Sequence, residues 1–315
     1  MAEIFIEQLK PGQEVNGIFV LKTKKLLPLR SGTGHYLAVV LGDKTGQMEG
    51  RAWESVNEIQ ESCRVGDIVN VQGQVAEYNG TAQIQISAMS VCQEGEADPY
   101  RFIPSSTLDL DTARAKLLLV IGSLHNPHLK SLLSLILSDD DFHNALFTSP
   151  AAKRNHHATI GGLLEHSLGI VSAAEQIAPV YPKIDRDLLV AGALLHDIGK
   201  VEEYSFGTDI DFTDEGRLLG HIVLGVRLLD KYISRLPDFP EELRLKLLHM
   251  IVSHHGQYEW QSPKRPKFLE AAVLHHLDMI DAAVDMFSSA VESRADQEDH
   301  WTGWVKGLDR YVFCK

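Results

Sequence analysis

The stretch ALLHDIGK, residues 193–200, places a histidine and an aspartate inside an apolar run. The leucines before the pair belong to a pattern over 188–198 that repeats every 3.6 residues and predicts an α-helix, and Gly199 is a typical helix end. Neighbouring helical residues point about 100° apart, but in the last turn His196 and Asp197 could both lean toward one cation or bridge two. A buried carboxylate without a partner costs several kcal/mol. A bound cation at Asp197 is therefore the simplest interpretation.

The same helical period continues over most of the chain after residue 107. Ser106-Thr107 and Asp185 are predicted helix N-caps, because their side chains can accept hydrogen bonds from the first turn of a helix. We expect an all-α bundle over residues 107–315, in which facing helices can carry the ligands of one metal site. Helices are expected at 113–124, 129–137, 163–178, 188–198, 218–233, 241–253 and 269–291.

The first 95 residues have the pattern of strands instead. A short helical stretch at 55–63 separates the third strand from the fourth. Five strands with a helix in that place follow the order of an OB-fold barrel, and a small β-sandwich is the alternative. The charged, Gly- and Pro-containing segment 96–106 cannot continue a strand or a helix and is predicted to be a linker. The strands are expected at 15–22, 35–43, 48–54, 67–78 and 83–91, since these runs are rich in β-branched and aromatic residues.

Composition narrows the class of protein. Of the 315 residues, 44% are hydrophobic and 23% are charged, which is typical of a soluble globular chain. No apolar run approaches the roughly 20 residues that span a bilayer, and the amino terminus lacks the pattern of a secretory signal. The three cysteines, at 63, 92 and 314, form no CxxC pair, so neither a disulfide framework nor a thiolate zinc site is expected. These features favour a cytoplasmic protein without membrane contact.

Charge and histidine content point in different directions. The net charge of −13 disfavours nucleic-acid binding by the chain as a whole, because attraction to phosphates dominates that affinity. The 15 histidines are more informative, because several recur with aspartates at expected helix ends or on helix faces. Imidazole and carboxylate together bind divalent transition metals. The residues concerned are His166, His196, Asp197, His221, His254, His255 and Asp278.

At this point the chain resembles a known family. The order His166, His196-Asp197, Asp278 is similar to the H…HD…D signature of the HD-domain phosphohydrolases, and HDIGK is close to its usual form. His221 and the pair His254-His255 resemble the branch with additional histidines, in which a second metal can bind. An OB-like domain before such a domain resembles the YhaM-type 3′→5′ exoribonucleases. So do the run KRNHHA at 153–158 before GGLLEHSL, and GLDR at 307–310.

The resemblance implies a metal-dependent 3′–5′ exoribonuclease that hydrolyses single-stranded RNA, with single-stranded DNA as a further candidate substrate. It implies one or two divalent ions per chain, with Mn²⁺ favoured and Co²⁺, Fe²⁺, Ni²⁺ or Zn²⁺ as alternatives, and it is compatible with a homo-oligomer. A nucleotide or cyclic-dinucleotide phosphohydrolase is the alternative enzyme. A nucleic-acid-binding protein without catalysis is a third hypothesis. The predicted metal ligands are His166, His196, Asp197, His221, His254 and Asp278.

Several side chains near these ligands have two interpretations each. His254 and His255 should point about 100° apart, so that one faces the metal and the other the substrate or solvent. Asp197, which could bridge two ions, could also orient the nucleophile. Lys200 could hold a non-bridging phosphate oxygen or be a favourable lysine at a helix end. His275, His276 and Asp281 are expected at the surface or as hydrogen-bond partners of the ligands.

Residues 153–157 form a basic cluster just before the first ligand helix. Lys153, Arg154, His156 and His157 could guide the substrate backbone, or could belong to a solvated loop. Either interpretation places positive charge close to the expected metal site.

The barrel domain has a local basic stretch. No acid lies between Glu14 and Asp43, and this part carries Lys22, Lys24, Lys25 and Arg30. It leads into the loop before the second strand, where OB folds commonly meet nucleic acid. Tyr36 and Trp53 could stack on bases, although Trp53 could instead belong to the barrel core. Residues 1–95 carry 8 Lys/Arg and 11 Asp/Glu, a charge of −3, so we expect modest, salt-sensitive binding.

Overall fold

The computed structural model divides the chain into two compact units. One contains Met1–Ser105 with Phe206–Ile210, and the other contains Ser106–Ser205 with Asp211–Lys315. The structure describes residues 4–29, 32, 34–78, 80–93, 95–98, 101–106, 108–153, 157–292 and 300–314.

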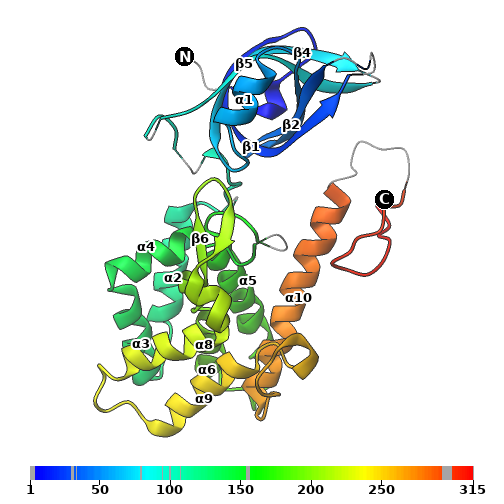
Figure 1. Ribbon diagram of the computed structural model, residues 1–315. Coiled ribbons are helices and arrows are strands. Elements are labelled where there is room, and N and C mark those ends of the chain that lie inside the picture. Colours follow the sequence, from blue (N-terminus) through cyan, green and yellow to red (C-terminus); the bar gives the residue numbers. More distant parts are fainter. Residues whose placement is uncertain are drawn as a thin grey trace. The chain divides into compact units, whose positions relative to one another are not determined.

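The first unit is a closed five-stranded barrel with the strand order β1-β2-β3-β5-β4 (Figure 1). The parallel pair β3–β5 and the antiparallel pair β1–β4 close it. The predicted OB-fold order, with a helix between the third and fourth strands, is confirmed. The strands are β1 (Glu14–Pro28), β2 (His35–Asp43), β3 (Gly46–Ala52), β4 (Ile68–Tyr78) and β5 (Thr81–Val91), the helix is α1 (Val56–Ser62), and a 3-10 turn, η1 (Ile6–Gln8), precedes them.

Alternating side chains fill the barrel, among them the fully buried Phe19, Leu37 and Ile84. The first strand is longer than the predicted 15–22, because its second half pairs with β2 as far as Pro28. The register between β4 and β5 shifts at Gly73. A Cβ on that residue would lie 2.2 Å from the Gln85 carbonyl oxygen, so the bulge requires glycine.

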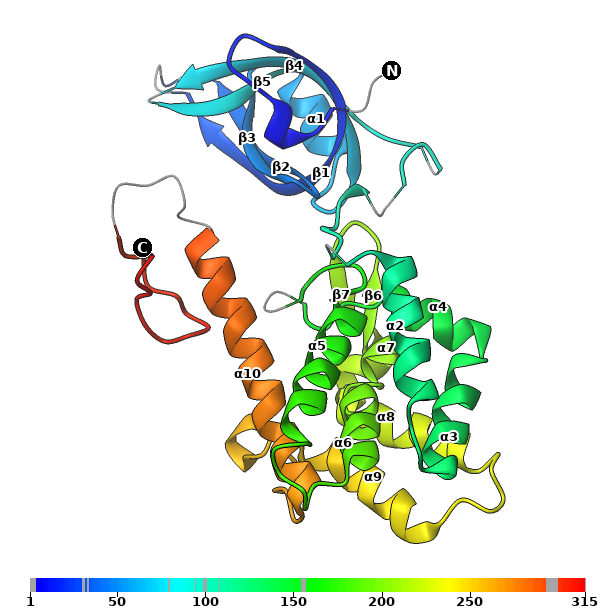
Figure 2. The same ribbon diagram turned by 180° about the vertical axis from the view of Figure 1, so that it is seen from behind.

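The second unit is a helical bundle around the central helices α5 and α6, which α10 and α9 contact. The carboxyl-terminal half of α10 extends past the other helices (Figure 2). The helices are α2 (Leu110–Gly122), α3 (Pro127–Leu137), α4 (Asp140–Thr148), α5 (Gly162–Ile177), α6 (Arg186–Leu195), α7 (Lys200–Glu203), α8 (Asp214–Ile233), α9 (Glu241–Ser253) and α10 (Leu269–Glu292).

Some details of the predicted helices were wrong. The first begins after the cap Asp109, which accepts a hydrogen bond from Thr112 N, and not at Ser106-Thr107, of which Thr107 lies outside the described residues. The predicted region was not purely helical, because it contains the short strands β6 (Tyr204–Phe206) and β7 (Ile210–Phe212) and the 3-10 turn η3 (Tyr258–Trp260). The predicted cap Asp185 is confirmed, since it accepts from Leu188 N.

Two short breaks in the helices position the site. Helix α6 ends at Leu195, earlier than predicted, with His196 as its C-cap, and Gly199 precedes α7. Helix α8 contains one non-helical residue, Gly220, at φ 71° and ψ 159°. Within the described part of the chain, none of the helices has the length and apolar character needed to cross a bilayer.

Candidate metal centre

Six predicted ligands converge in the helical unit from separate elements. His166 lies on α5, His196 caps α6, and Asp197 follows it in the turn before α7. His221 comes directly after the break at Gly220, and His254 is the C-cap of α9. The sixth, Asp278, lies on α10.

Asp197 lies at the middle of this cluster with a pair of histidines on each side. Its Oδ2 is 3.5 Å from His166 Nε2 and 3.3 Å from His196 Nε2. Its Oδ1 is 3.6 Å from His221 Nε2 and 3.4 Å from His254 Nε2. The geometry therefore suits two adjacent cation positions that share one carboxylate.

The second aspartate joins only one of the two pairs. Asp278 Oδ1 is 3.3 Å from His166 Nε2 and 3.9 Å from His196 Nε2. The arrangement is asymmetric: one position has two histidines and two carboxylates, and the other has His221, His254 and the shared Asp197.

The Nδ1 atom of each of these four histidines faces an acceptor. For His166 it is Asp281 Oδ2 at 2.7 Å, and for His221 it is Glu203 Oε1 at 3.2 Å. His196 and His254 use the carbonyls of Ala193 and Ile251, at 2.9 and 2.7 Å. A proton on each Nδ1 leaves each Nε2 lone pair free for a metal.

Several ligand atoms lack hydrogen-bond partners. Asp197 Oδ1, His221 Nε2 and His254 Nε2 are buried without one among the residues that the structure describes. The Nε2 atoms of His166 and His196 face each other at 3.2 Å. Unpartnered buried polar atoms are costly, and a divalent cation between them would satisfy them all. The donor set, imidazole with carboxylate, suits a transition metal.

The electrostatics also favour positive charge here. Burial opposes the charged form of His166, but Asp197, Asp278 and Asp281 outweigh it and hold the pKa of His166 well above its usual value. Burial likewise opposes ionisation of Asp197, and the nearby Lys200 and His196 nevertheless hold its pKa well below the usual range. The carboxylates therefore stay ionised and available to a cation.

Lys200 pairs with the central carboxylate. Its Nζ lies 2.6 Å from Asp197 Oδ2, and the residue is 8% exposed. The side chain lines the same cavity as the ligands. Its predicted contact with a phosphate oxygen stays a prediction.

His254 and His255 point in different directions, as expected. His254 faces Asp197 and is 1% exposed. His255 is half-buried, and its Nδ1 lies 2.8 Å from the carbonyl oxygen of Trp260. A ligand atom of His255 nevertheless lies within 4.8 Å of those of His221 and His254, so His255 is at the edge of the second cation position.

A cavity of about 350 Å³ reaches this centre from the surface. Its lining includes Tyr204, Trp260 and Met279, to which sequence reasoning gave no role, and also His275, which was expected at the surface or as a hydrogen-bond partner of the ligands. The full lining is Ala151, Ala152, Asp197, Lys200, Tyr204, His221, His254, His255, Trp260, His275, Asp278, Met279 and Ala282.

Two carboxylates lie behind the ligand histidines, and the sequence analysis missed one of them, Glu203. Glu203, 5% exposed, accepts from both the backbone N and Nδ1 of His221. Asp281 Oδ2 accepts a hydrogen bond from His166 Nδ1 and another from His157 Nε2, the latter at 3.0 Å. His275 is buried and its Nδ1 donates to His254 O at 2.7 Å, whereas His276 is exposed. Asp281, three residues after Asp278, was expected at the surface or as a hydrogen-bond partner of a ligand, and it is the partner of His166, whereas no spacing in the sequence indicates Glu203.

The basic cluster before α5 is engaged within the unit. Lys153 Nζ lies 2.7 Å from Asp211 Oδ1, and His157 lies between Asp281 and Glu165, whose Oε2 is 3.4 Å from His157 Nδ1. Arg154 and His156 fall outside the described residues. Lys153 and His157 therefore already have acidic partners in the fold.

On the barrel, two of the predicted base-stacking residues lie together. The rings of Tyr36 and Trp53 stack at 4.6 Å, and Trp53 is 48% exposed, so the alternative that it belongs to the core is wrong. Arg51, which sequence reasoning missed, lies over the rings of Tyr36 and Tyr78 at 5.8 and 5.1 Å.

The predicted lysines of the barrel differ in availability. Lys24 Nζ donates to the carbonyls of Gln60 and Cys63, and Lys22 is half-buried. Lys25 is exposed, whereas Arg30 lies outside the described residues. Of the three lysines, Lys25 is the most accessible to a ligand.

Comparisons with known proteins match both units. A family model described as an HD domain matches residues 163–283, and one described as an OB-fold nucleic acid binding domain matches residues 19–91. A 3′-5′ exoribonuclease YhaM from Shouchella clausii (strain KSM-K16) is 34% identical over 311 residues, 98% of this chain and 96% of that protein.

Solved structures resemble single parts of the chain. The second OB-fold domain of replication protein A from Methanococcus maripaludis covers 30% of this chain and 100% of its own, at 21% identity and TM-score 0.25. The HD domain of phosphodiesterase PgpH from L. monocytogenes covers 49% of this chain and 80% of its own, at 18% identity and TM-score 0.31.

Proposed function

This chain belongs to the family of YhaM 3′-5′ exoribonucleases, and from that membership we propose that it hydrolyses single-stranded RNA from the 3′ end with divalent metal ions. The observation that carries the proposal is Asp197 between two pairs of histidine Nε2 atoms. A buried set of imidazole nitrogens and carboxylate oxygens can hold the divalent ions that assist phosphodiester hydrolysis.

The residues present fit one or two ions. His166, His196, Asp197 and Asp278 would hold the first, and His221, His254 and the other oxygen of Asp197 the second. A bound divalent ion lowers the pKa of water toward neutrality and offsets charge on phosphoryl oxygens. Imidazole and carboxylate donors suit Mn²⁺, which the family resemblance favours, and also Co²⁺, Fe²⁺, Ni²⁺ or Zn²⁺.

The side chains around the centre then have distinct tasks. Asp281 and Glu203 keep the protons of His166 and His221 on Nδ1. Lys200, at the wall of the cavity, can exchange its contact with Asp197 for a non-bridging oxygen of the scissile phosphate, where its charge stabilises the transition state. His255 lies at the cavity edge, and because its Nδ1 donates to the Trp260 carbonyl, its Nε2 can accept a hydrogen bond from the substrate.

The barrel supplies single-stranded nucleic-acid binding through one aromatic face. Tyr36, Trp53 and Tyr78 offer ring surfaces for bases, and Arg51 lies over two of these rings. Stacking on aromatic side chains with nearby positive charge is the usual way to bind a single strand without sequence preference. Either RNA or single-stranded DNA could use this face.

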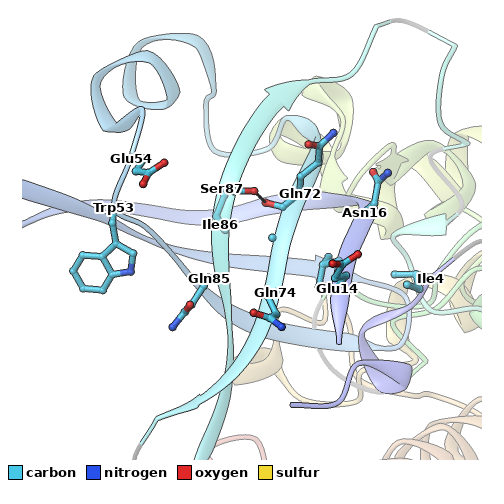
Figure 3. Close-up of a pocket in the computed structure, with 12 residues that line it drawn as sticks. Ile4, Glu14, Asn16, Trp53, Glu54, Gln72, Gln74, Gln85, Ile86 and Ser87 are labelled. Atoms are coloured by element: carbon cyan, nitrogen blue, oxygen red, sulfur yellow. Dashed lines mark hydrogen bonds between the residues drawn. The ribbon is translucent and has the colours of Figure 1, made fainter. Parts of the chain in front are cut away.

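A second feature of the barrel is less suited to a phosphate backbone. Figure 3 shows amide and acidic side chains around a cavity of the barrel, with Trp53 at one side. The cavity has a volume of about 840 Å³, and among the residues that the structure describes its lining contains Glu14 and Glu54 but no lysine or arginine. We therefore propose that the single-stranded nucleic acid binds the aromatic face rather than this cavity.

A digestion series tests the proposed activity. The full chain, supplied in turn with Mn²⁺, Co²⁺, Zn²⁺ and Mg²⁺, is incubated with 5′-labelled RNA and DNA. We expect a one-nucleotide ladder from the 3′ end that depends on the ion, and Asp197→Asn should lower the rate by at least about 10³-fold, because it removes the shared ligand. Glu292→Gln, at the exposed end of α10, is the control.

The products separate this function from its alternatives. Hydrolysis restricted to mononucleotides or cyclic dinucleotides would replace the proposal with the second enzyme hypothesis. A purified protein that contains no metal by elemental analysis and still binds RNA would favour a non-catalytic role. An Asp197→Asn protein as active as the wild type would contradict the assignment of the centre.

A further inference from the structure

The segment between α9 and α10 combines aromatic and basic side chains beside the metal cavity. Residues 257–267, QYEWQSPKRPK, contain three basic residues and one acidic residue, a charge of +2 in a chain of net charge −13. Lys264, Arg265 and Lys267 are all exposed. This is a local reversal of the overall charge, next to the site where a polyanion would react.

The two aromatic residues of the segment are open to solvent. Tyr258 is 56% exposed and Trp260 is 50% exposed. Trp260 lines the cavity of the metal centre, and its ring lies 6.1 Å from that of His275. Arg265 lies 5.1 Å over the ring of Tyr258. Large aromatic surfaces left open beside a polar cavity mark a binding surface rather than a core.

The backbone under these side chains is fixed. Ser262 is buried and donates its hydroxyl to Lys264 O at 2.7 Å, while Ser262 N donates to Gln257 O and Lys264 N donates to Val252 O, both at 3.1 Å. Lys267 N donates to His249 Nε2 at 3.0 Å. Gln261 adopts φ 65°, a strained conformation for a residue other than glycine. The segment is therefore preorganised, which lowers the entropic cost of binding.

The same segment also borders a second cavity. This cavity, of about 620 Å³, includes Gln261 and Pro263 from the segment, and Arg217 and exposed leucines from the start of α8. It shares Tyr204, His221 and His255 with the metal cavity. A chain lying along the segment would thus pass from one cavity to the other past the metal ligands.

We propose that residues 257–267 form the platform that feeds the 3′ end of the RNA into the metal centre. Trp260 stacks on the base of the terminal nucleotide, and Lys264, Arg265 and Lys267 contact the phosphates behind it. The inference rests on the proposed exoribonuclease function for its substrate. Its evidence is separate, since none of these four residues is a metal ligand.

The first test pairs a protein variant with a substrate variant. Oligoadenylate with an intact or an abasic 3′-terminal nucleotide is offered to the wild type, Trp260→Ala and Trp260→Phe. We expect Trp260→Ala to raise KM about tenfold on the intact substrate, because one base stack is lost, with kcat nearly unchanged. For the wild type, the abasic end should raise KM by the same factor of about ten. For Trp260→Ala, the abasic end should cause no further rise in KM. Trp260→Phe should restore most of the affinity for the intact substrate.

Trp304→Ala is the matched control, because Trp304 is 56% exposed and packs on Tyr311 in the carboxyl-terminal segment. A Trp260→Ala variant that loses the same factor on intact and abasic ends would overturn the stacking role. So would an unchanged KM.

The second test measures charge through equilibrium binding. In an Asp197→Asn background, which prevents turnover, the salt dependence of oligoadenylate binding is compared with and without K264A/R265A/K267A. Each phosphate contact contributes about 0.7 to the slope of log K against log salt for a single strand, so we expect the slope to fall by about 2. K116A/K130A/K231A, which removes three exposed lysines elsewhere in the unit, should leave it unchanged.

The two proposals fail in different ways. A wild type that binds RNA with the expected slopes but releases no nucleotides would contradict the exoribonuclease function and leave the platform supported. A wild type that digests RNA while both platform variants behave like their controls would contradict the platform alone.

Discussion

Each ligand histidine presents Nε2 to the centre because something else occupies its Nδ1. For His166 that partner is Asp281, a carboxylate on another helix at 2.7 Å. Burial opposes ionisation of Asp281, but its hydrogen bonds with His157 and His166 outweigh burial and hold its pKa well below the usual range. A permanently ionised Asp281 fixes both the tautomer and the orientation of His166.

We therefore expect Asp281→Asn to weaken metal binding about 10- to 100-fold. Activity at saturating metal should fall much less, because the ligand itself is kept. Titration of the metal-free protein with Mn²⁺, followed by calorimetry and by activity, measures both quantities. Glu292→Gln, at the exposed end of the same helix, should bind metal like the wild type, and an Asp281→Asn protein with unchanged affinity would show that Asp281 does not position His166.

At the scale of elements, the start of α6 is attached to the turn before α3 through Asp187. This side chain is 8% exposed and accepts from the backbone N–H groups of His125 and Asn126 at 2.6 and 2.7 Å. Burial opposes its ionisation, but these two donors and Arg186 lower its pKa. A group with a lowered pKa stabilises the fold above its unfolded pKa of about 3.9 and loses that contribution as the pH falls.

Asp187→Asn should therefore lower the free energy of unfolding by about 1–3 kcal/mol at pH 7, the usual cost of weakening buried, charge-assisted hydrogen bonds. The difference from the wild type should shrink as the pH is lowered through 4 and below. Urea unfolding of the helical signal at several pH values measures it. A constant difference across that range would mean that ionised Asp187 contributes nothing.

Helix α8 offers a second prediction at this scale. Gly220 takes φ 71° and ψ 159° in the break that precedes His221. Among the described residues, an added Cβ would find only Glu203 Oε1 within 4 Å, at 3.8 Å, so the penalty of an alanine is conformational strain rather than a clash. Gly220→Ala should destabilise the protein by about 1–3 kcal/mol and weaken the metal position of His221 and His254. Thermal unfolding and metal stoichiometry check the two effects, and an alanine variant with two intact metal positions would contradict this account.

At the scale of the whole molecule, the candidate metal ligands all belong to the helical unit, and the stacked pair Tyr36–Trp53 belongs to the barrel. This division predicts that the aromatic face of the barrel affects the binding of long RNA and not the chemical step. We expect Trp53→Ala to weaken binding of long single-stranded RNA about tenfold, with an unchanged kcat and an unchanged KM for a dinucleotide. Fluorescence anisotropy and steady-state kinetics measure these. Val65→Ala, an exposed apolar change on the same barrel, is the control, and equal loss with both substrates would contradict the division.

The chain's order of strands and helices was predictable because it depends on local periodicity. Ile84 and Ile86 alternate with polar neighbours, and the leucines before His196 repeat with a helical period. His196 and Asp197 were identifiable as candidate ligands because a charged pair in an apolar run needs an explanation, whereas His221 and His254 were assigned through the family resemblance. Glu203 and Trp260 were missed because only tertiary packing brings Glu203 to His221 and opens Trp260 to the cavity. Nothing in their own sequence neighbourhoods distinguishes them from surface residues.

The four histidines differ in how their direction is set. His196 and His254 each hydrogen-bond a carbonyl three residues earlier in their own helix, at Ala193 and Ile251, whereas His166 and His221 depend on carboxylates from other elements. Two of the four histidines are thus oriented by the backbone of the helix that they end, without a side chain from another element. These two helix ends could be transferred to another helical bundle as single segments that present an oriented imidazole. His166 and His221 would have to be transferred together with Asp281 and Glu203.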